Sequence, residues 1–161
     1  MTEARAVGFR EARRGDLERL VDLLASDPLG QLREDAGRST TSRYEAAFET
    51  LDADPHHLLL VAVVDDRVIA MLQLSYLPHL TYQGGWRAQI EGVRVDASER
   101  GAGVGRALVE EAIRRAEARG CHLVQLTTDK RRPEALRFYE GLGFVASHVG
   151  LKKHFDRGSS P

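Results

Sequence analysis

Residues 93–106 read Val-Arg-Val-Asp-Ala-Ser-Glu-Arg-Gly-Ala-Gly-Val-Gly-Arg and pass from a strand pattern directly into a helical one. Glycine lets the backbone adopt positive φ angles and approach a ligand closely. Free N–H groups and the dipole at a helix N-terminus together form a site for an anion. Because the glycines alternate between two arginines, the stretch predicts a turn that binds a pyrophosphate. The three glycines are Gly101, Gly103 and Gly105.

Other phosphate motifs fit this stretch less well. A P-loop needs a Gly-Lys dipeptide, and the sequence has none. The Rossmann fingerprint is G-x-G-x-x-G with an acidic residue about 20 positions further on, and Asp129 lies roughly there, so spacing alone leaves that motif open. However, a Rossmann motif opens a repeated strand–helix series, whereas hairpin-like strands precede this one. A glycine-rich turn without a ligand is the third interpretation.

Upstream of the glycines, the apolar pattern changes with the type of element. A weak strand over residues 7–10 is followed by helical spacing after Asp16 and again after Ser42. Apolar runs over residues 57–64 and 68–76 predict a hairpin around a short turn. The apolar faces expected on the two helices are Leu17, Leu20, Val21 and Leu24, then Tyr44, Ala47, Phe48 and Leu51.

The remaining elements predict a mixed sheet with helices on both faces, which is an α/β fold of the mixed α+β type. A strand over residues 86–95 is interrupted by Gly92, and a glycine inside a strand often marks a bulge or a close approach of another backbone. The connection from Val95 to Leu123 is long enough for a parallel crossover. A last helix begins at Pro133. Final strand material is expected at residues 144–149 and 151–155.

Composition limits the class of protein. With 161 residues, of which 42% are hydrophobic, we expect one domain over residues 1–157 and a flexible tail over residues 158–161. The net charge of −1 argues against a protein that coats nucleic acid. The single cysteine, Cys121, excludes an intrachain disulfide and a cysteine-based zinc site. The longest apolar run, residues 58–64, is too short to span a membrane, so we expect a cytoplasmic protein.

Two motifs in this order resemble a known family. Val93-Arg94-Val95 and the pattern Arg-x-x-Gly-x-Gly over residues 100–105 are followed by Ala-Leu-Arg-Phe-Tyr-Glu-Gly-Leu-Gly-Phe over residues 135–144. This combination resembles the GNAT superfamily of N-acetyltransferases. The resemblance implies a mostly antiparallel sheet of six to seven strands with a central splayed parallel pair and about four helices. It also implies direct transfer of an acetyl group from acetyl-CoA to a primary amine.

A closer resemblance points to one subgroup of that family. Residues 125–132, together with Trp86 and the Gln-Ile-Glu that follows at residues 89–91, are similar to the aminoalkylphosphonate N-acetyltransferases. Between Tyr76 and Tyr82 the chain departs from that subgroup, because His79 is the only histidine there. We therefore expect no metal ligands.

The resemblance assigns the acetyl-CoA contacts. Residues Val93 and Val95 would pair with the pantetheine arm like an added strand, and the N–H near Val93 would face the thioester carbonyl. Asp129 either hydrogen-bonds the cofactor or caps its own turn. The full expected set is Val93, Arg94, Val95, Arg100, Gly101, Ala102, Gly103, Val104, Gly105, Arg106, Asp129 and Tyr139.

Two side chains are candidates for proton transfer. An amine is mostly protonated at pH 7 and must lose a proton before it attacks, so a nearby carboxylate is needed. Glu91 is the candidate base, and the alternative is a strand carboxylate paired with an arginine such as Arg87. By resemblance, Tyr139 would protonate the leaving thiolate, and the alternative is a core aromatic residue beside Phe138.

The acceptor is expected to be the primary amine of a small molecule. Its candidate contacts are Pro28, Leu29, His79 and Tyr82. A protein or peptide N-acetyltransferase and a non-catalytic acetyl-CoA-binding module are the alternatives. No nucleic-acid or membrane partner is expected, and the resemblance is compatible with a homodimer.

Overall fold

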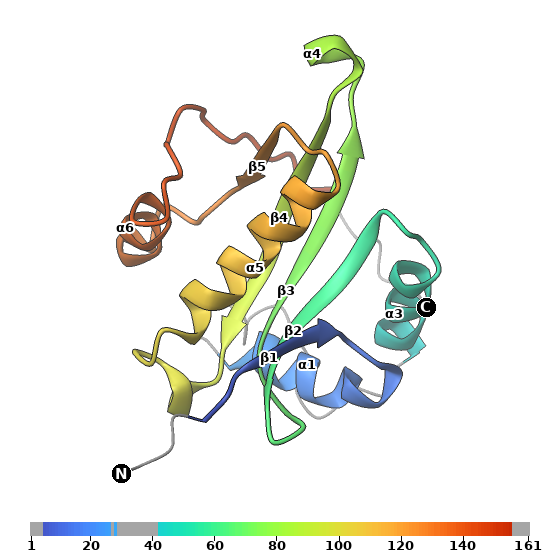
Figure 1. Ribbon diagram of the computed structural model, residues 1–161, viewed down its shortest axis with the longest axis vertical. Coiled ribbons are helices and arrows are strands. Elements are labelled where there is room, and N and C mark those ends of the chain that lie inside the picture. Colours follow the sequence, from blue (N-terminus) through green and yellow to red (C-terminus); the bar gives the residue numbers. More distant parts are fainter. Residues whose placement is uncertain (1–4, 27, 29–41, 156–161) are drawn as a thin grey trace. The chain divides into compact units, whose positions relative to one another are not determined.

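The computed structural model describes residues 5–26, 28 and 42–155 (Figure 1). Two compact units divide the chain, Met1–Leu126 and Thr127–Pro161, and each is described by itself. The single-domain assignment stays a prediction, and the expected tail over residues 158–161 lies outside the described residues.

One mixed sheet forms the centre of the first unit. Its strands lie in the order β1-β2-β3-β4-β5; β1 to β4 pair antiparallel, and β4 pairs parallel with β5. The mixed fold class is therefore confirmed, with five strands in the described residues instead of six or seven. The strands are β1 (Gly8–Glu11), β2 (His57–Val64), β3 (Arg67–Pro78), β4 (Trp86–Val95) and β5 (Leu123–Leu126).

Helices cover both faces of this sheet. Helix α5 (Val104–Ala118) packs against β2, β3, β4 and β5, while α1 (Leu17–Ala25) contacts β3 and β4, and α3 (Ser42–Asp52) contacts β2. In Figure 1, α5 lies on one side of the sheet and α1 on the other. The remaining short elements of this unit are η1 (Arg14–Asp16), α4 (Thr81–Gly84) and η2 (Ala97–Glu99).

Alternation along the central strands sorts their side chains between the two helical layers. Tyr76 is buried on the α5 side, where the Arg119 guanidinium lies 4.4 Å from its ring centre. Burial raises the pKa of the Tyr76 phenol. On the other side, the buried residues of α1, α3, β2 and β3 form one core cluster. Its members are Leu20, Leu23, Phe48, Val61, Val68 and Met71.

The second unit contains α6 (Pro133–Glu140), which begins with the proline that the sequence predicts at its first turn. The expected final strands at residues 144–149 and 151–155 were wrong, because residues 144–155 form no strand. Their apolar side chains are strongly exposed, and the segment pairs with no described strand. An apolar sequence pattern does not by itself provide the neighbouring strand edge that a β-strand needs. The exposed residues are Val145, Val149, Leu151 and Phe155.

Candidate active site

The glycine-rich stretch forms the turn that leads into α5. Gly101 and Gly103 have φ angles of +80° and +81°, and Gly103 is the residue that precedes the first helical turn. A Cβ atom at either position would meet no heavy atom within 4 Å, so the space beside them is open. Glycine is required here by the backbone angle, and the open space leaves room for a ligand to approach the chain.

The N-terminus of α5 has the features of an anion site. No side chain caps it in the described part of the chain, and the first bond into the helix runs from Ala107 N to Gly103 O at 3.0 Å. The N–H groups of Val104 and Gly105 therefore point out of a 15-residue helix without a carbonyl acceptor inside it. The helix dipole adds partial positive charge at this end. These features fit the pyrophosphate of a nucleotide cofactor.

The arginines on either side of the glycines differ in their surroundings. Arg100 is exposed. The Arg106 Nε atom lies 3.0 Å from Glu110 Oε1, one turn along the same helix. Arg100 and the helix end therefore both place positive charge beside the glycine turn.

A bulge interrupts β4 just before the glycine turn. Gln73 pairs with Glu91, but Met71 pairs with Arg94, so β4 contains one residue more than β3 across this interval. Gly92, with φ of +64°, is the residue that makes the bulge. The bulge predicted at Gly92 is confirmed.

At the same point, β4 parts from β5. The two strands pair over only four residue pairs, the last of which is Ile90 with Leu126. From Glu91 to Val95, β4 pairs with β3 alone among the described strands. The predicted parallel pair is confirmed, and past the end of β5 one edge of β4 at Val93 and Val95 lies outside the ladder of the described strands.

Glu91 lines an apolar cavity of about 270 Å³ on the α1 and α3 side of the sheet. Leu59, Gln73 and Glu91 are direct cross-strand neighbours, so they form one row along the base of this cavity. Among the described residues, Glu91 has no ion-pair partner, and Arg87 bonds instead to Thr81 and Gln125. Helices α1 and α3 provide the remaining wall, with Leu17, Leu20, Val21, Leu24, Tyr44, Ala47, Phe48 and Leu51.

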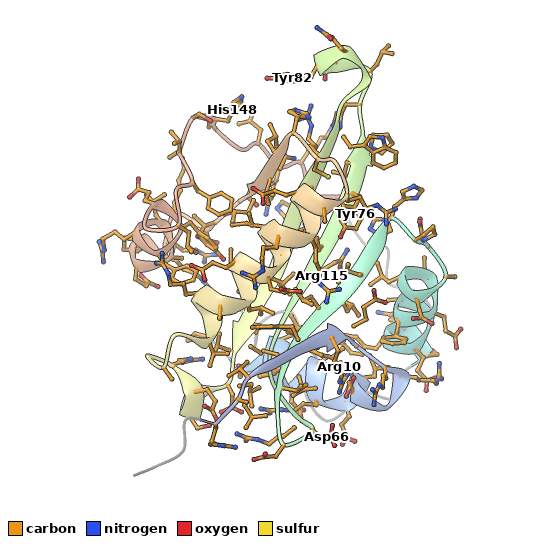
Figure 2. All side chains as sticks on the ribbon, viewed as in Figure 1. Arg10, Asp66, Tyr76, Tyr82, Arg115 and His148 are labelled. Atoms are coloured by element: carbon orange, nitrogen blue, oxygen red, sulfur yellow. The ribbon has the colours of Figure 1, made fainter. Side chains whose placement is uncertain are left out.

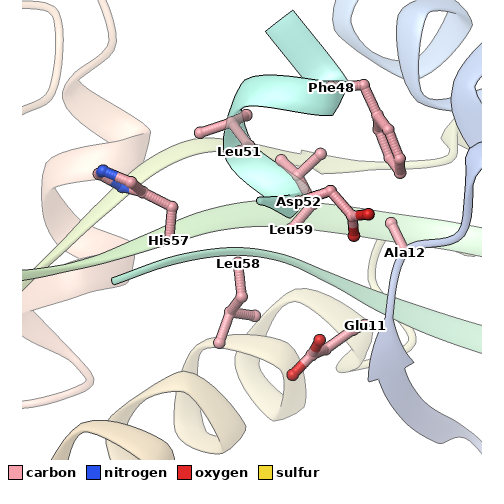
Figure 3. Close-up of a pocket in the computed structure, with 8 residues that line it drawn as sticks. All are labelled: Glu11, Ala12, Phe48, Leu51, Asp52, His57, Leu58 and Leu59. Atoms are coloured by element: carbon pink, nitrogen blue, oxygen red, sulfur yellow. The ribbon is translucent and has the colours of Figure 1, made fainter. Parts of the chain in front are cut away.

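A second cavity lies between α3, β2 and the end of β1 (Figure 3). Its volume is about 30 Å³, which is about the space that one water molecule occupies. Figure 3 also shows Leu58 on the opposite side of β2 from His57 and Leu59. The larger cavity, which contains Glu91, is therefore the candidate acceptor pocket.

Two of the residues expected to contact the acceptor lie elsewhere. Tyr82 is on α4, at the end of the β3–β4 hairpin (Figure 2). Its ring is tilted against that of His122, with the ring centres 4.7 Å apart. His79 Nδ1 lies 3.0 Å from Leu77 O. The hairpin end is five residue pairs beyond Gln73, or roughly 16 Å along the strand. Neither residue lines the Glu91 cavity, and their role in acceptor binding stays a prediction.

The other two residues expected to contact the acceptor are Pro28 and Leu29, which follow α1 in the sequence. Pro28 is exposed and does not line the cavity. Leu29 lies outside the described residues.

The second unit contains Tyr139 and Asp129. Tyr139 makes edge-to-face contacts with Phe138 at 5.1 Å and Phe144 at 5.8 Å. Asp129 accepts hydrogen bonds from the Arg131 guanidinium and from Arg131 N, which holds the pKa of its carboxyl well below the ordinary value. Asp129 therefore caps its own turn, one of the two roles expected, and its contact with a cofactor stays a prediction.

One link between α1 and the glycine turn was not foreseen. Asp96, directly after β4, accepts hydrogen bonds from Ser98 N at 2.8 Å and Ser98 Oγ at 2.6 Å. Its other oxygen pairs with Arg19 of α1. The Ser98 bonds and then the guanidinium lower the pKa of the Asp96 carboxyl strongly. No motif marks this pair, because the two residues are far apart in sequence.

Among residues 5–26, 28 and 42–155, no three His, Cys, Asp or Glu side chains gather in an arrangement that could hold a metal ion. Within the same residues, no helix combines the length and apolar character needed to span a bilayer.

Together, the fold and site define a class of α/β enzymes that bind a phosphate-bearing cofactor at a helix N-terminus beside a strand with one open edge. Residues 17–144 match the model of the acetyltransferase (GNAT) family. The chain belongs to this family, and it is an acetyl-CoA-dependent N-acetyltransferase.

Individual relatives support the assignment. A crystal structure from Bacillus halodurans C-125, described as a transcriptional regulator, is 53% identical with a TM-score of 0.90, covering 93% of this chain and 100% of that one. Glucosamine 6-phosphate N-acetyltransferase 1 of Oryza sativa subsp. japonica is 30% identical over 94% of this chain and 86% of its own length. Aminoalkylphosphonate N-acetyltransferase of Salmonella typhimurium is 31% identical over 66% of this chain and 68% of its own length.

Proposed function

We propose that this protein transfers the acetyl group of acetyl-CoA to the primary amine of a small molecule by direct attack in a ternary complex. One observation supports this most strongly: Glu91 lines an apolar cavity at the bulge where β4 leaves β5. The carboxylate is thus on the strand that has the open edge and that leads toward the glycine turn. The relatives named for glucosamine 6-phosphate and aminoalkylphosphonate favour a small-molecule acceptor.

Glu91 acts as the base in this proposal. The acceptor enters mostly as an ammonium ion, and its nitrogen becomes nucleophilic only after a proton leaves. The Glu91 carboxylate, without an ion-pair partner among the described residues, accepts that proton directly or through water. Gln73 lies opposite it on β3 and lines the same cavity, so its amide can orient the amine.

Backbone groups hold the other reactant. Acetyl-CoA supplies the thioester that is to be cleaved. Val93 offers its N–H to the carbonyl oxygen, on which negative charge develops. The N–H groups of Val104 and Gly105 bind the pyrophosphate at the N-terminus of α5.

The proton and bond changes balance. One ammonium proton passes to Glu91, the amine nitrogen then forms a bond to the acetyl carbon, and the carbon–sulfur bond breaks. The nitrogen loses a second proton as the amide forms, and this proton offsets the one delivered to the leaving thiolate. Tyr139 is assigned the proton that neutralises the leaving thiolate, a role that rests on the family resemblance.

The test is an assay of free thiol release with acetyl-CoA and a panel of amines that includes a peptide. Glu91→Gln should lower kcat about 100-fold or more, because general base catalysis contributes about 10²–10⁴. Glu18→Gln is the matched control, since Glu18 is exposed on α1 and does not line the cavity. Unchanged kinetics in the Glu91 variant would remove this residue from the role of base.

A second candidate is a module that binds acetyl-CoA without transferring its acetyl group. One relative is described as a transcriptional regulator, a description that names no acetyl transfer. Calorimetry distinguishes the two functions: tight coenzyme A binding without thiol release on any amine would support the module. The cytoplasmic location and the homodimer stay predictions.

A further inference from the structure

Among the residues that the structure describes, the lining of the Glu91 cavity is mostly apolar. Its lining comes from α1, α3, β2, β3 and the β4 bulge, and Glu91 is the only charged residue among its described lining. The other polar side chains there are Gln73 and Tyr44. No arginine, lysine or histidine is found in this described lining.

Two arginines near this face are engaged with the protein. Arg19 donates from Nε to Val68 O at 3.1 Å and also pairs with Asp96. Arg94 lies opposite Met71, and its guanidinium donates to Val93 O at 2.8 Å. Neither residue lines the cavity.

This lining selects against a phosphorylated acceptor. A phosphate transferred from water into apolar surroundings without a paired cation pays a large desolvation penalty. An apolar group gains roughly 25 cal/mol for each Å² removed from water. The cavity also places a carboxylate next to the acceptor, which repels a phosphate and attracts an ammonium ion.

We propose that the acceptor is a small primary amine with an aryl or branched-alkyl group and no phosphate or phosphonate. The apolar group occupies the cavity beneath α1 and α3, and the amine lies between Glu91 and Gln73. An apolar cavity of about 150 Å³ accommodates benzene, so the 270 Å³ present here is enough for a ring and a short chain. This inference rests on the proposed function and specifies its substrate class.

The experiment compares primary amines with different substituents. We expect 2-phenylethylamine to have a kcat/KM at least about tenfold above that of 2-aminoethylphosphonate, a ratio typical of filling or missing an apolar pocket. Glucosamine 6-phosphate is the third substrate. With coenzyme A bound, calorimetry on 2-phenylethylamine should give a negative heat-capacity change, the mark of apolar burial.

A matched pair of variants tests the cavity itself. Ala47 and Ala46 are neighbouring exposed residues of α3, but only Ala47 lines the cavity. Leucine is a good helix former, so both substitutions leave α3 intact. Ala47→Leu should lower kcat/KM for 2-phenylethylamine about tenfold, with little change for ethylamine or in the KM for acetyl-CoA. Ala46→Leu should have no effect on any of these values.

The outcomes separate this inference from the proposed function. A kcat/KM that favours either phosphorylated amine would overturn the inference and leave the acetyltransferase intact. Equal effects of Ala47→Leu and Ala46→Leu would show that the cavity does not hold the acceptor, again without affecting the proposed function. Thiol release with none of these amines, or with the peptide alone, would overturn both.

Discussion

At the scale of single residues, Gly92 decides the direction of the reacting edge. A Cβ atom at this position would meet only Leu24 Cδ2, at 3.8 Å, which is ordinary contact. The φ of +64°, and not a lack of space, therefore requires glycine. The bulge separates two functions along one strand, since Glu91 faces the cavity just before it and Val93 lies at the open edge just after it.

Gly103 is the residue whose replacement should separate cofactor binding from stability. In Gly103→Ala, the side chain is forced into a backbone angle that costs about 1 kcal/mol, and the turn that presents the α5 N–H groups is distorted. We expect the KM for acetyl-CoA to rise about tenfold with a smaller change in the KM for the amine. Steady-state kinetics with each substrate varied in turn provide the measurement.

Gly120 offers the control for this substitution. It has a φ of +83° and follows the other end of the same helix. Gly120→Ala should lower the free energy of unfolding by a similar amount and leave the KM for acetyl-CoA unchanged. Equal rises in KM in both variants would mean that the effect comes from strain and not from the anion site.

Residue types that carry chemistry were visible in the sequence, but the strand residue that lies opposite Glu91 was not. The alternating glycines and Glu91 stand out because few structural or chemical roles fit these residue types at these positions in the sequence. Gln73 resembles any half-buried strand residue, and only the register that pairs it with Glu91 brings it into the site. Register across three strands depends on long-range contacts that local pattern does not encode.

At the scale of elements, Asp96 ties three segments together. It ends β4, caps η2 through Ser98 and pairs with Arg19 of α1. A wall of the acceptor cavity and the turn before the cofactor site are thereby joined through one carboxylate. Loss of that carboxylate should lower the free energy of unfolding more than the loss of one partner in an exposed surface ion pair does.

The stability contribution of Asp96 depends on pH. Its pKa in the folded protein lies well below the ordinary value, so the contribution is present at neutral pH and is lost as the pH falls below about 4. Asp96→Asn should lower the free energy of unfolding by about 1–2 kcal/mol at pH 7. The difference from the unmodified protein should shrink at pH 3.

Urea unfolding at both pH values measures this effect. Asp22→Asn is the control, because Asp22 is an exposed carboxylate on the same helix as Arg19. A destabilisation by Asp96→Asn that is the same at pH 3 and pH 7 would show that the ionised carboxylate is not the cause.

Element prediction succeeded where one face of the element is buried. Strands β2 and β4 have the predicted bounds, and the two apolar helix faces predicted after Asp16 and Ser42 both line the Glu91 cavity. Residues 144–155 show the limit: their apolar residues fit a strand pattern, but a strand also needs a neighbouring edge. Whether a neighbouring edge is available depends on the whole fold and not on the sequence of the segment itself.

At the scale of the whole molecule, basic and acidic residues nearly balance, and positive charge acts at particular sites. The chain carries 23 basic and 24 acidic residues, so its net charge is close to zero. Many ionic side chains pair with each other, including Arg10 with Asp16 at 2.7 Å and Arg115 with Glu111 at 2.8 Å. A cofactor with several phosphates can still bind, because the backbone N–H groups of α5 provide a positive end without a basic surface.

Binding at such a site must stabilise the fold that presents it. Coenzyme A at about 100 times its Kd adds about 2.7 kcal/mol to the free energy of unfolding, because the unfolded chain has no helix end to bind it. For a protein of this size, that corresponds to a rise in Tm of about 5–10 °C. Differential scanning fluorimetry over a series of coenzyme A concentrations gives this shift. Gly103→Ala should reduce the shift and Gly120→Ala should retain it, so an equal shift in both variants would place the pyrophosphate away from the N-terminus of α5.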